Sequence, residues 1–195
     1  MRKVVVTEGL SLDGVMQAPG DPDEDRSGGF EHGGWQMPYF DETALAKVGE
    51  SIAKTGAFLF GRRTYEIMAR YWPNAPEDNM FAEALNGLPK YVASTTLQEP
   101  LSWQNSTLLQ GEVADSVAAL KEEPGGDIVV LGSGQLARSL LQHDLVDGYA
   151  LSIHPLLLGT GKRLFDGDGQ RVPLRLTDSW TTSTGVIWAT YQLDR

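Results

Sequence analysis

The chain of 195 residues has the length of a single domain, and its 41% hydrophobic and 22% charged residues favour a packed core over disorder. The formal net charge of −10 argues against nucleic acid and anionic membranes as partners, because both are bound through basic patches. Cysteine is absent, which excludes disulfides, thiol nucleophiles and cysteine-based metal sites.

Short apolar runs alternate along the chain with segments of helical spacing. In chain order, the pattern predicts a strand at 4–8, a helix at 41–54, a strand at 57–60, helices at 64–71 and 80–85, strands at 91–94 and 107–109, a helix at 113–121, a strand at 128–131, a helix at 135–142 and a strand at 149–153. Two longer strands, 174–182 and 185–193, follow around the turn Ser183-Thr184-Gly185. We therefore expect one domain, 1–195, with a three-layer α/β/α fold. Its mixed, mostly parallel central sheet is closed by a C-terminal antiparallel hairpin.

The N-terminal apolar run is expected to open the fold as a strand rather than to form a signal peptide, because it is short and is broken at Glu8. No apolar run approaches the roughly 18 residues that span a membrane. The 3 histidines show no metal-binding spacing such as HExxH. These patterns predict a cytoplasmic protein without a metal site.

A long loop is expected between the first strand and the first helix. Residues 18–34 hold several glycines and prolines, together with the acidic cluster Asp21, Asp23, Glu24 and Asp25. Loops of this length in compact domains are usually functional or disordered. Two interpretations stay open: a lid over an active site that moves at its glycines, and a disordered surface insertion.

Ligands of such sheets bind beyond the carboxyl ends of the strands, so the residues after each strand are the first candidates. Gly61-Arg62-Arg63-Thr64 follows the 57–60 strand, and Thr64 is placed to cap the next helix. Helix N-termini and arginines bind phosphate, although a surface arginine pair gives the same pattern. Ser94 and Thr95 end the 91–94 strand, where hydroxyls either satisfy a turn or bind a ribose phosphate.

Small residues follow the 128–131 strand. Gly132-Ser133-Gly134-Gln135-Leu136 leads from this strand into a helix, an arrangement in which backbone N–H groups can approach a pyrophosphate. A tight strand–helix turn is the alternative, and the full GxGxxG pattern is not present. Three such turns in one sheet indicate a long anionic cofactor that lies across several strand ends.

Two further segments are candidates for the substrate side. Asp13 follows the first strand, where it also suits a turn. Trp35, Phe40 and Asp41 lie just before the first helix, where the aromatic residues also suit the core and the carboxylate also suits helix capping.

These turns, in this order, resemble the dihydrofolate reductase-like superfamily, and more closely its branch related to the C-terminal reductase domain of the bifunctional riboflavin biosynthesis protein. The resemblance covers nearly the whole chain, from Arg2 to Leu193. It is carried by SLDG at 11–14, GRRTYE at 61–66, KYVAST at 90–95, and the segment 127–165, which contains GSG at 132–134 and HPLLLGTGKRLF at 154–165.

The resemblance implies a reductase that uses NADPH and transfers hydride to a small heterocycle, as 5-amino-6-(5-phosphoribosylamino)uracil reductase or a dihydrofolate reductase does. It implies that the adenosine and phosphate side is held by Gly61, Arg62, Arg63, Thr64, Ser94 and Thr95. The pyrophosphate and the nicotinamide ribose would lie along Gly132, Ser133, Gly134, Gln135 and Leu136. The substrate side would comprise Leu12, Gly14, Trp35 and Phe40.

The sequence departs from the folate-reducing pattern at its acid. Folate-reducing members carry Trp-x-x-Pro-x-acid, whereas here Trp35 and Pro38 are followed by Phe40, and the acid comes one residue later at Asp41. Asp13 and Asp41 are the candidate catalytic proton donors, and either would need a raised pKa in that role. The alternative is a nucleotide-binding protein of the same fold without turnover.

The resemblance also implies a homodimer. Aromatic residues of the C-terminal hairpin, among them Trp180, Trp188 and Tyr191, would lie either at such an interface or in the core.

Overall fold

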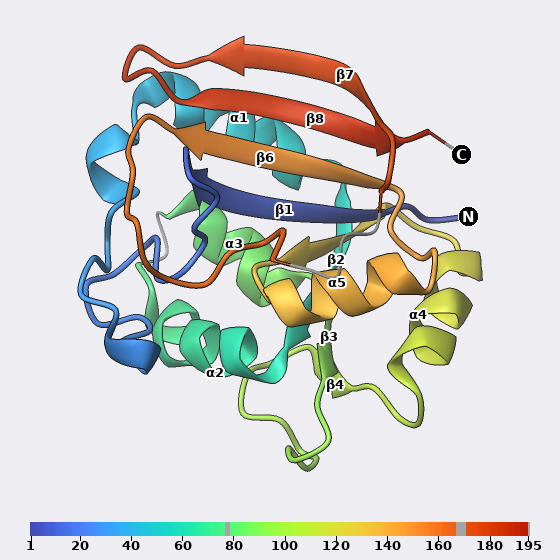
Figure 1. Ribbon diagram of the computed structural model, residues 1–195. Coiled ribbons are helices and arrows are strands. Elements are labelled where there is room, and N and C mark those ends of the chain that lie inside the picture. The colour runs from blue at the N-terminus through green and yellow to red at the C-terminus, as the bar shows by residue number, and fades with distance from the viewer. Residues whose placement is uncertain (77–78, 167–170, 195) are drawn as a thin grey trace. The chain divides into compact units, whose positions relative to one another are not determined.

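The structure is a computed structural model that describes residues 1–76, 79–166 and 171–194. Its helices and strands are, in chain order, β1 (Val4–Ser11), α1 (Glu42–Ile52), β2 (Thr55–Gly61), α2 (Arg62–Tyr71), α3 (Met80–Gly87), β3 (Lys90–Ala93), β4 (Ser106–Leu108), α4 (Val113–Glu122), β5 (Asp127–Leu131), α5 (Gly134–Gln142), β6 (Gly148–His154), β7 (Leu174–Thr181) and β8 (Ile187–Leu193). The strands form a mixed sheet in the order β4-β3-β2-β5-β1-β6-β8-β7 (Figure 1). The α/β fold predicted from the sequence is confirmed, with element ends that move by only a few residues.

The chain divides by its internal contacts into two compact units. Unit 1 comprises residues 1–5 and 48–147, and unit 2 comprises residues 6–47 and 148–195. Both units are discontinuous in sequence, because the chain passes from one to the other within β1, within α1 and after Asp147. The single domain expected from the sequence stays a prediction.

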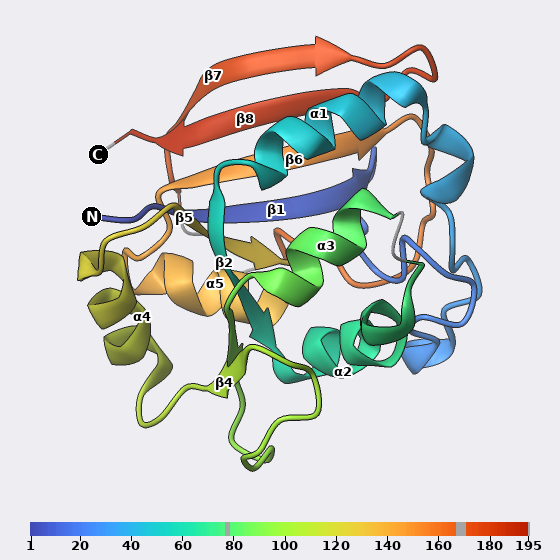
Figure 2. The ribbon, with the colours of Figure 1, turned by 180° about the vertical axis from the view of Figure 1, so that it is seen from behind.

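Unit 1 is built on the parallel strands β4, β3, β2 and β5. The apolar residues 57–60 of β2 are all buried, as expected for a parallel strand that is covered on both faces. Phe58 and Phe60 form a core cluster with Tyr65 of α2 and Leu85 of α3, and Figure 2 shows these helices on that face. Helices α4 and α5 lie on the opposite face (Figure 1), so helical layers cover both sides of this sheet.

A buried cation joins β3 to the end of α3. Lys90 is fully buried, and its Nζ donates to the carbonyl oxygens of Leu85 (2.7 Å) and Leu88 (2.9 Å). The same Nζ lies 4.7 Å from the centroid of the Trp103 ring. Burial lowers the pKa of the Lys90 ammonium to about 8. Lys90 therefore pairs carbonyl groups that the C-terminus of α3 leaves without helical partners.

Unit 2 contains the antiparallel strands β6, β8 and β7. Trp180 of β7 and Trp188 of β8 pair directly across the hairpin and stack with their ring centroids 5.1 Å apart. The C-terminal hairpin predicted from the sequence is thus confirmed. No helix in the described ranges of the chain is long and apolar enough to cross a membrane.

The acidic loop 18–34 is a folded part of unit 2. Phe30 forms a buried cluster with Val15 and Trp35, and Lys162 Nζ contacts the Asp25 carboxylate at 2.5 Å. These contacts anchor the loop at an apolar and a charged point. They do not fit a disordered insertion, and the movement of this loop as a lid stays a prediction.

Candidate functional site

Three of the predicted turns follow neighbouring strands of unit 1. β3 and β5 both pair in parallel with β2, and Gly61 at the end of β2 lies opposite Ala93 at the end of β3. Parallel strands end at the same edge of a sheet, so the turns that begin at Gly61, Ser94 and Gly132 gather at one edge.

The turns after β2 and β5 are interlocked by one serine. Ser133 has a left-handed backbone (φ 63°), and its Oγ donates to Thr64 Oγ1 at 2.8 Å and accepts the Gly61 N–H at 2.8 Å. A Cβ added at Gly132, where φ is 64°, would lie 3.1 Å from Thr64 Cγ2. One added at Gly61 would lie 3.2 Å from Ser133 Oγ. A side chain at either position would crowd the facing turn, and at Gly132 the positive φ also favours glycine.

The expected helix cap at Thr64 is wrong. α2 begins two residues earlier, at Arg62, so Thr64 lies inside its first turn, and its hydroxyl is bonded to Ser133. At the starts of both α2 and α5, two described helices, no side chain makes a capping hydrogen bond. The first-turn N–H groups, which include those of Gly134, Gln135 and Leu136, therefore remain donors for an anion at the positive ends of two helix dipoles.

The two arginines of this turn differ in their partners. Arg62 Nη1 lies 3.1 Å from Glu66 Oε2, one helical turn on. Arg63 is exposed, and no partner of its guanidinium is found among the described residues. Since a free guanidinium binds phosphate without first breaking an ion pair, Arg63 is the better placed of the two.

The hydroxyl of Ser94 organises its own turn. Ser94 Oγ accepts the N–H groups of Thr96 (3.1 Å) and Leu97 (3.0 Å), while Thr95 is exposed beside it. The Ser94 proton can still be donated, so this turn and a phosphate contact are compatible.

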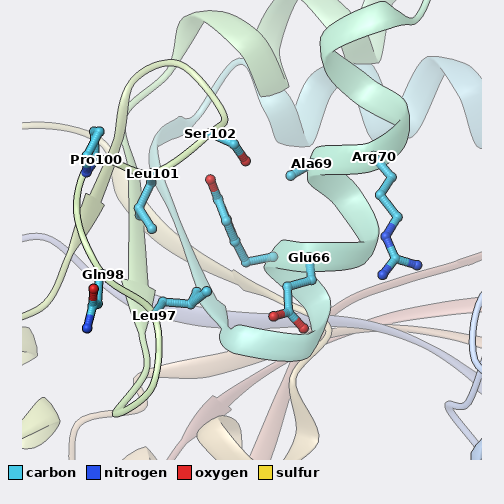
Figure 3. Close-up of a pocket in the computed structure, with 9 residues that line it drawn as sticks. Glu66, Ala69, Arg70, Leu97, Gln98, Pro100, Leu101 and Ser102 are labelled. Atoms are coloured by element: carbon cyan, nitrogen blue, oxygen red, sulfur yellow. The ribbon is translucent and has the colours of Figure 1, made fainter.

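A hollow of about 400 Å³ lies beside these turns in unit 1. Figure 3 shows its two walls, Glu66, Ala69 and Arg70 on α2 and the segment 97–102 after β3. Glu66 both lines the hollow and pairs with Arg62, and Leu97 is bonded to Ser94. The hollow is therefore continuous with the predicted adenosine and phosphate side.

In unit 2, Asp13 holds the segment that follows β6. Its Oδ1 accepts from Ser11 Oγ (2.6 Å) and from the Leu158 N–H (3.1 Å), and its Oδ2 accepts from the Gly159 N–H (2.9 Å) and Arg163 Nη2 (3.3 Å). The Ser11 hydrogen bond and the two backbone donors hold the pKa of Asp13 well below its usual range. Asp13 is thus a structural anion, and the raised pKa that a proton donor requires is not found.

Asp41 is also committed to structure. Its Oδ1 accepts the Ala44 N–H (2.8 Å) at the start of α1, and its Oδ2 accepts from the hydroxyl (2.7 Å) and N–H (3.0 Å) of Ser183. The Ser183 hydroxyl and the Ala44 N–H lower the pKa of Asp41. Helix capping, one of the two roles expected of this residue, is present.

The other substrate-side candidates are spread between core and surface. Trp35 is buried, and its Nε1 donates to the Gln17 carbonyl at 2.7 Å, which places it in the core of unit 2. Leu12 is 64% exposed, Phe40 is half-buried, and Gly14 has φ 82°, which a turn at this point requires.

Sequence reasoning missed Glu8, which it treated as the residue that ends the first strand. β1 runs on to Ser11, so Glu8 lies in mid-strand and is only 6% exposed. Its Oε2 has no hydrogen-bond partner in the described structure, and its Oε1 accepts the Gly9 N–H at 3.2 Å. Burial raises the pKa of Glu8 to about 8, and the charge of Glu24 adds to this. The sequence could have indicated this, because Glu8 falls at every second position after Val4 and Val6, whose side chains point to the buried face of the strand.

The fold and these strand-end turns define the class of the protein. The chain has the dihydrofolate reductase-like fold: it is similar to dihydrofolate reductase from Enterococcus faecalis complexed with NADP(H) and RAB-propyl, with a TM-score of 0.63 and 12% identity over 99% of this chain and 97% of that one. It is also similar to a putative riboflavin biosynthesis protein from Shewanella sp. PV-4, with a TM-score of 0.70 and 20% identity over 99% of each chain.

Within this class, the model of the RibD C-terminal domain matches residues 2–188, so the chain belongs to the RibD C-terminal domain family. It is 32% identical over 136 residues to the uncharacterized protein YyaP of Bacillus subtilis (strain 168), across 68% of this chain and 71% of that protein. The resemblance inferred from the sequence is confirmed at the level of family and fold.

Proposed function

We propose that this chain is an NADPH-dependent reductase that transfers hydride to a small heterocycle of the pyrimidine or pterin type. The observation that carries the proposal is the interlocked pair of turns in unit 1, where Gly61, Thr64 and Ser133 join the starts of two helices without side-chain caps. In a family of reductase-like fold, such a cradle is suited to a dinucleotide phosphate.

The residues present fit that cofactor. The glycines Gly61 and Gly132 let the two turns pack closely, and the first-turn N–H groups of α5, at Gly134, Gln135 and Leu136, have no side-chain cap and can donate to an anion. Arg63 would bind the additional phosphate of NADPH, and the hollow beside α2 would receive the adenosine end. When bound, NADPH would supply the hydride, and the chain would supply position and electrostatics.

The acidic character of the chain is compatible with this role. Asp21, Asp23, Glu24 and Asp25 place much of the negative charge in one loop of unit 2, whereas the proposed phosphate contacts belong to unit 1. Binding depends on local charge, because exposed charges are screened beyond roughly 8–10 Å at ordinary salt. We also propose that the protein lies in the cytoplasm and forms a homodimer. An interface at the C-terminal hairpin is supported by three exposed apolar residues, Leu174, Leu176 and Ile187.

Cofactor binding tests the proposal directly. Intrinsic tryptophan fluorescence is titrated with NADPH and with NADH for the wild type, for Arg63→Ala, and for the control Lys54→Ala. The control removes an exposed cation of unit 1 just before β2, at the opposite end of this strand from Gly61. We expect Arg63→Ala to raise the NADPH dissociation constant about tenfold, the equivalent of one charge-assisted contact of about 1.4 kcal/mol, and to leave NADH binding nearly unchanged.

No response to either nucleotide would refute the proposal. Equal effects of Arg63→Ala and Lys54→Ala on NADPH binding would exclude Arg63 from the phosphate site. Tight NADPH binding without oxidation on any pyrimidine or pterin would favour the second candidate, a nucleotide-binding protein without turnover. That candidate is supported by the structural commitment of both Asp13 and Asp41.

A further inference from the structure

Glu8 differs from Gln17 and His154, two other buried polar residues of unit 2. Gln17 donates to the Ser27 carbonyl (2.9 Å) and accepts the Lys162 N–H (3.1 Å), and His154 Nδ1 lies 3.1 Å from the Leu10 carbonyl. Glu8 Oε2 has no such partner in the described structure, although the side chain is more than nine-tenths buried. An unpaired polar oxygen in an apolar strand is destabilising, so its presence indicates a partner other than the chain itself.

The surroundings of Glu8 are the segments predicted for the substrate side. β1 leads from Glu8 through Ser11 to Leu12, the first residue after the strand, which begins the stretch that the family resemblance puts beside the nicotinamide and the substrate. The side chain of Gln36 lies over the neighbouring Gly9, where an added Cβ would be 2.6 Å from Gln36 Oε1, and thus covers the face of β1 opposite to the Glu8 side chain. The ionisable group whose charge acts on Glu8 is Glu24, in the acidic loop. Within unit 2, Glu8 thus lies on the strand that leads into this stretch, within range of the charge of the acidic loop.

Three other carboxylates of these segments, Asp13, Asp41 and Glu24, are already bonded. Asp13 and Asp41 each accept at least three hydrogen bonds and are kept ionised, and Glu24 Oε2 accepts the N–H groups of Gly20 (2.7 Å) and Asp21 (3.2 Å). Glu8 has no cationic partner in the described structure and no second donor on Oε2, so it is held as the neutral acid. A neutral carboxyl offers one O–H donor and one carbonyl acceptor side by side.

We propose that Glu8 is the acid that binds and protonates the heterocycle, an inference that rests on the proposed reductase function. Its O–H and C=O pair with a ring lactam, in which a C=O and an N–H stand next to each other. As the hydride adds to the carbon of a ring double bond that is conjugated with this C=O, the O–H bond of Glu8 breaks and an O–H bond forms on the lactam oxygen. The resulting enol returns to the C=O form when its proton moves to the ring atom at the other end of the reduced bond. Glu8 is left as a carboxylate and takes a proton from water to complete the cycle.

Ring binding tests this role without relying on turnover. Dissociation constants of uracil and of pterin are measured in the presence of NADPH from about pH 6 to about 9, for the wild type, Glu8→Gln, Glu8→Leu and the control Glu123→Gln at an exposed site of unit 1. In the wild type, ring affinity should fall about tenfold per pH unit once Glu8 ionises. Glu8→Gln keeps a donor and an acceptor, so its affinity should be close to that of the wild type and independent of pH. Glu8→Leu should bind at least about tenfold more weakly at neutral pH.

Measurements of turnover and of NADPH binding distinguish the role of Glu8 from the proposed reductase function. Any ring substrate that the wild type reduces should be reduced about 10²–10⁴-fold more slowly by Glu8→Gln, while the affinity for NADPH stays unchanged. Identical pH profiles of ring binding in the wild type and Glu8→Gln, or no ring binding by an NADPH-bound wild type, would overturn the role of Glu8 and leave the cofactor site standing. If the wild type does not bind NADPH, both proposals are overturned.

Discussion

Replacing Glu8 by Gln should remove a pH dependence of stability that the wild type carries through the neutral range. The pKa of Glu8 is about 8 in the folded chain, against an ordinary value of 4.5 for the unfolded one. Between these values the unfolded chain loses this proton and the folded chain keeps it. The free energy of unfolding therefore falls as pH rises, and it levels off below about 4.5 and above about 8.

The size of the effect follows from the same two values. They differ by about 3.5 pH units (8 minus 4.5), and each unit corresponds to about 1.4 kcal/mol, so the full effect approaches about 5 kcal/mol. Relaxation around the ionised group would reduce this number, which makes it an upper value. Since Gln does not ionise, Glu8→Gln should unfold with a larger free energy than the wild type at pH 8. The difference should fall to about 1 kcal/mol at pH 5 and vanish only below about pH 4.5.

Urea unfolding from about pH 5 to about 9 measures this difference. His154 acts with the opposite sign at the lower end, because burial lowers its pKa and the unfolded chain then binds more protons. Subtracting the Glu8→Gln curve from the wild-type curve cancels this contribution. Glu123→Gln, the same chemical change at an exposed position, should run parallel to the wild type. If Glu8→Gln is also parallel to the wild type, Glu8 is ionised in the folded chain and the reasoning is refuted.

Two other predictions concern polar anchors of the fold. Asp13→Asn should lower the free energy of unfolding at neutral pH by about 2 kcal/mol and increase amide exchange at Leu158 and Gly159. The difference in free energy should disappear in acid, because a carboxyl with a lowered pKa stabilises the fold only above its unfolded pKa of 3.8. Unchanged amide exchange at Leu158 and Gly159 would contradict this role of Asp13. Lys90→Met keeps the length of the side chain but leaves the carbonyls of Leu85 and Leu88 unpaired. The free energy of unfolding should therefore fall by about 2–3 kcal/mol, and the thermal midpoint by roughly 4–12 °C. An unchanged midpoint would show that water replaces the ammonium.

The fold could be predicted because its signals are local. Runs of four apolar residues, such as 57–60 and 128–131, suit strands buried on both faces, and each is followed by a glycine where the chain turns into a helix. The gathering of the predicted turns at one edge then follows from parallel pairing alone. The same reasoning gave the positions of Gly61, Ser94 and Gly132 without any knowledge of their contacts.

What the sequence could not indicate depends on partners distant along the chain. Thr64 was predicted to cap its own helix, but its hydroxyl bonds to Ser133, 69 residues away. Arginine is disfavoured at a helix start, which hid the true beginning of α2 at Arg62. The sequence predicts that β1 ends at Glu8, because a carboxylate suits the exposed end of a strand, whereas the strand continues to Ser11 with Glu8 buried.

Asp13 and Glu8 show how opposite surroundings divide the work of two carboxyl groups that are five residues apart. Asp13 is surrounded by a hydroxyl, two backbone N–H groups and a guanidinium, so its anion is stabilised and its pKa is low. Glu8 has one weak donor, an apolar strand around it and a like charge nearby, so its acid form is stabilised and its pKa is high. Carboxyls whose pKa values are driven apart in this way can take different roles at one pH. At neutral pH only the one with the raised pKa still holds a proton to give, which is why the proton donor of a reductase built on this chain should be Glu8 rather than Asp13.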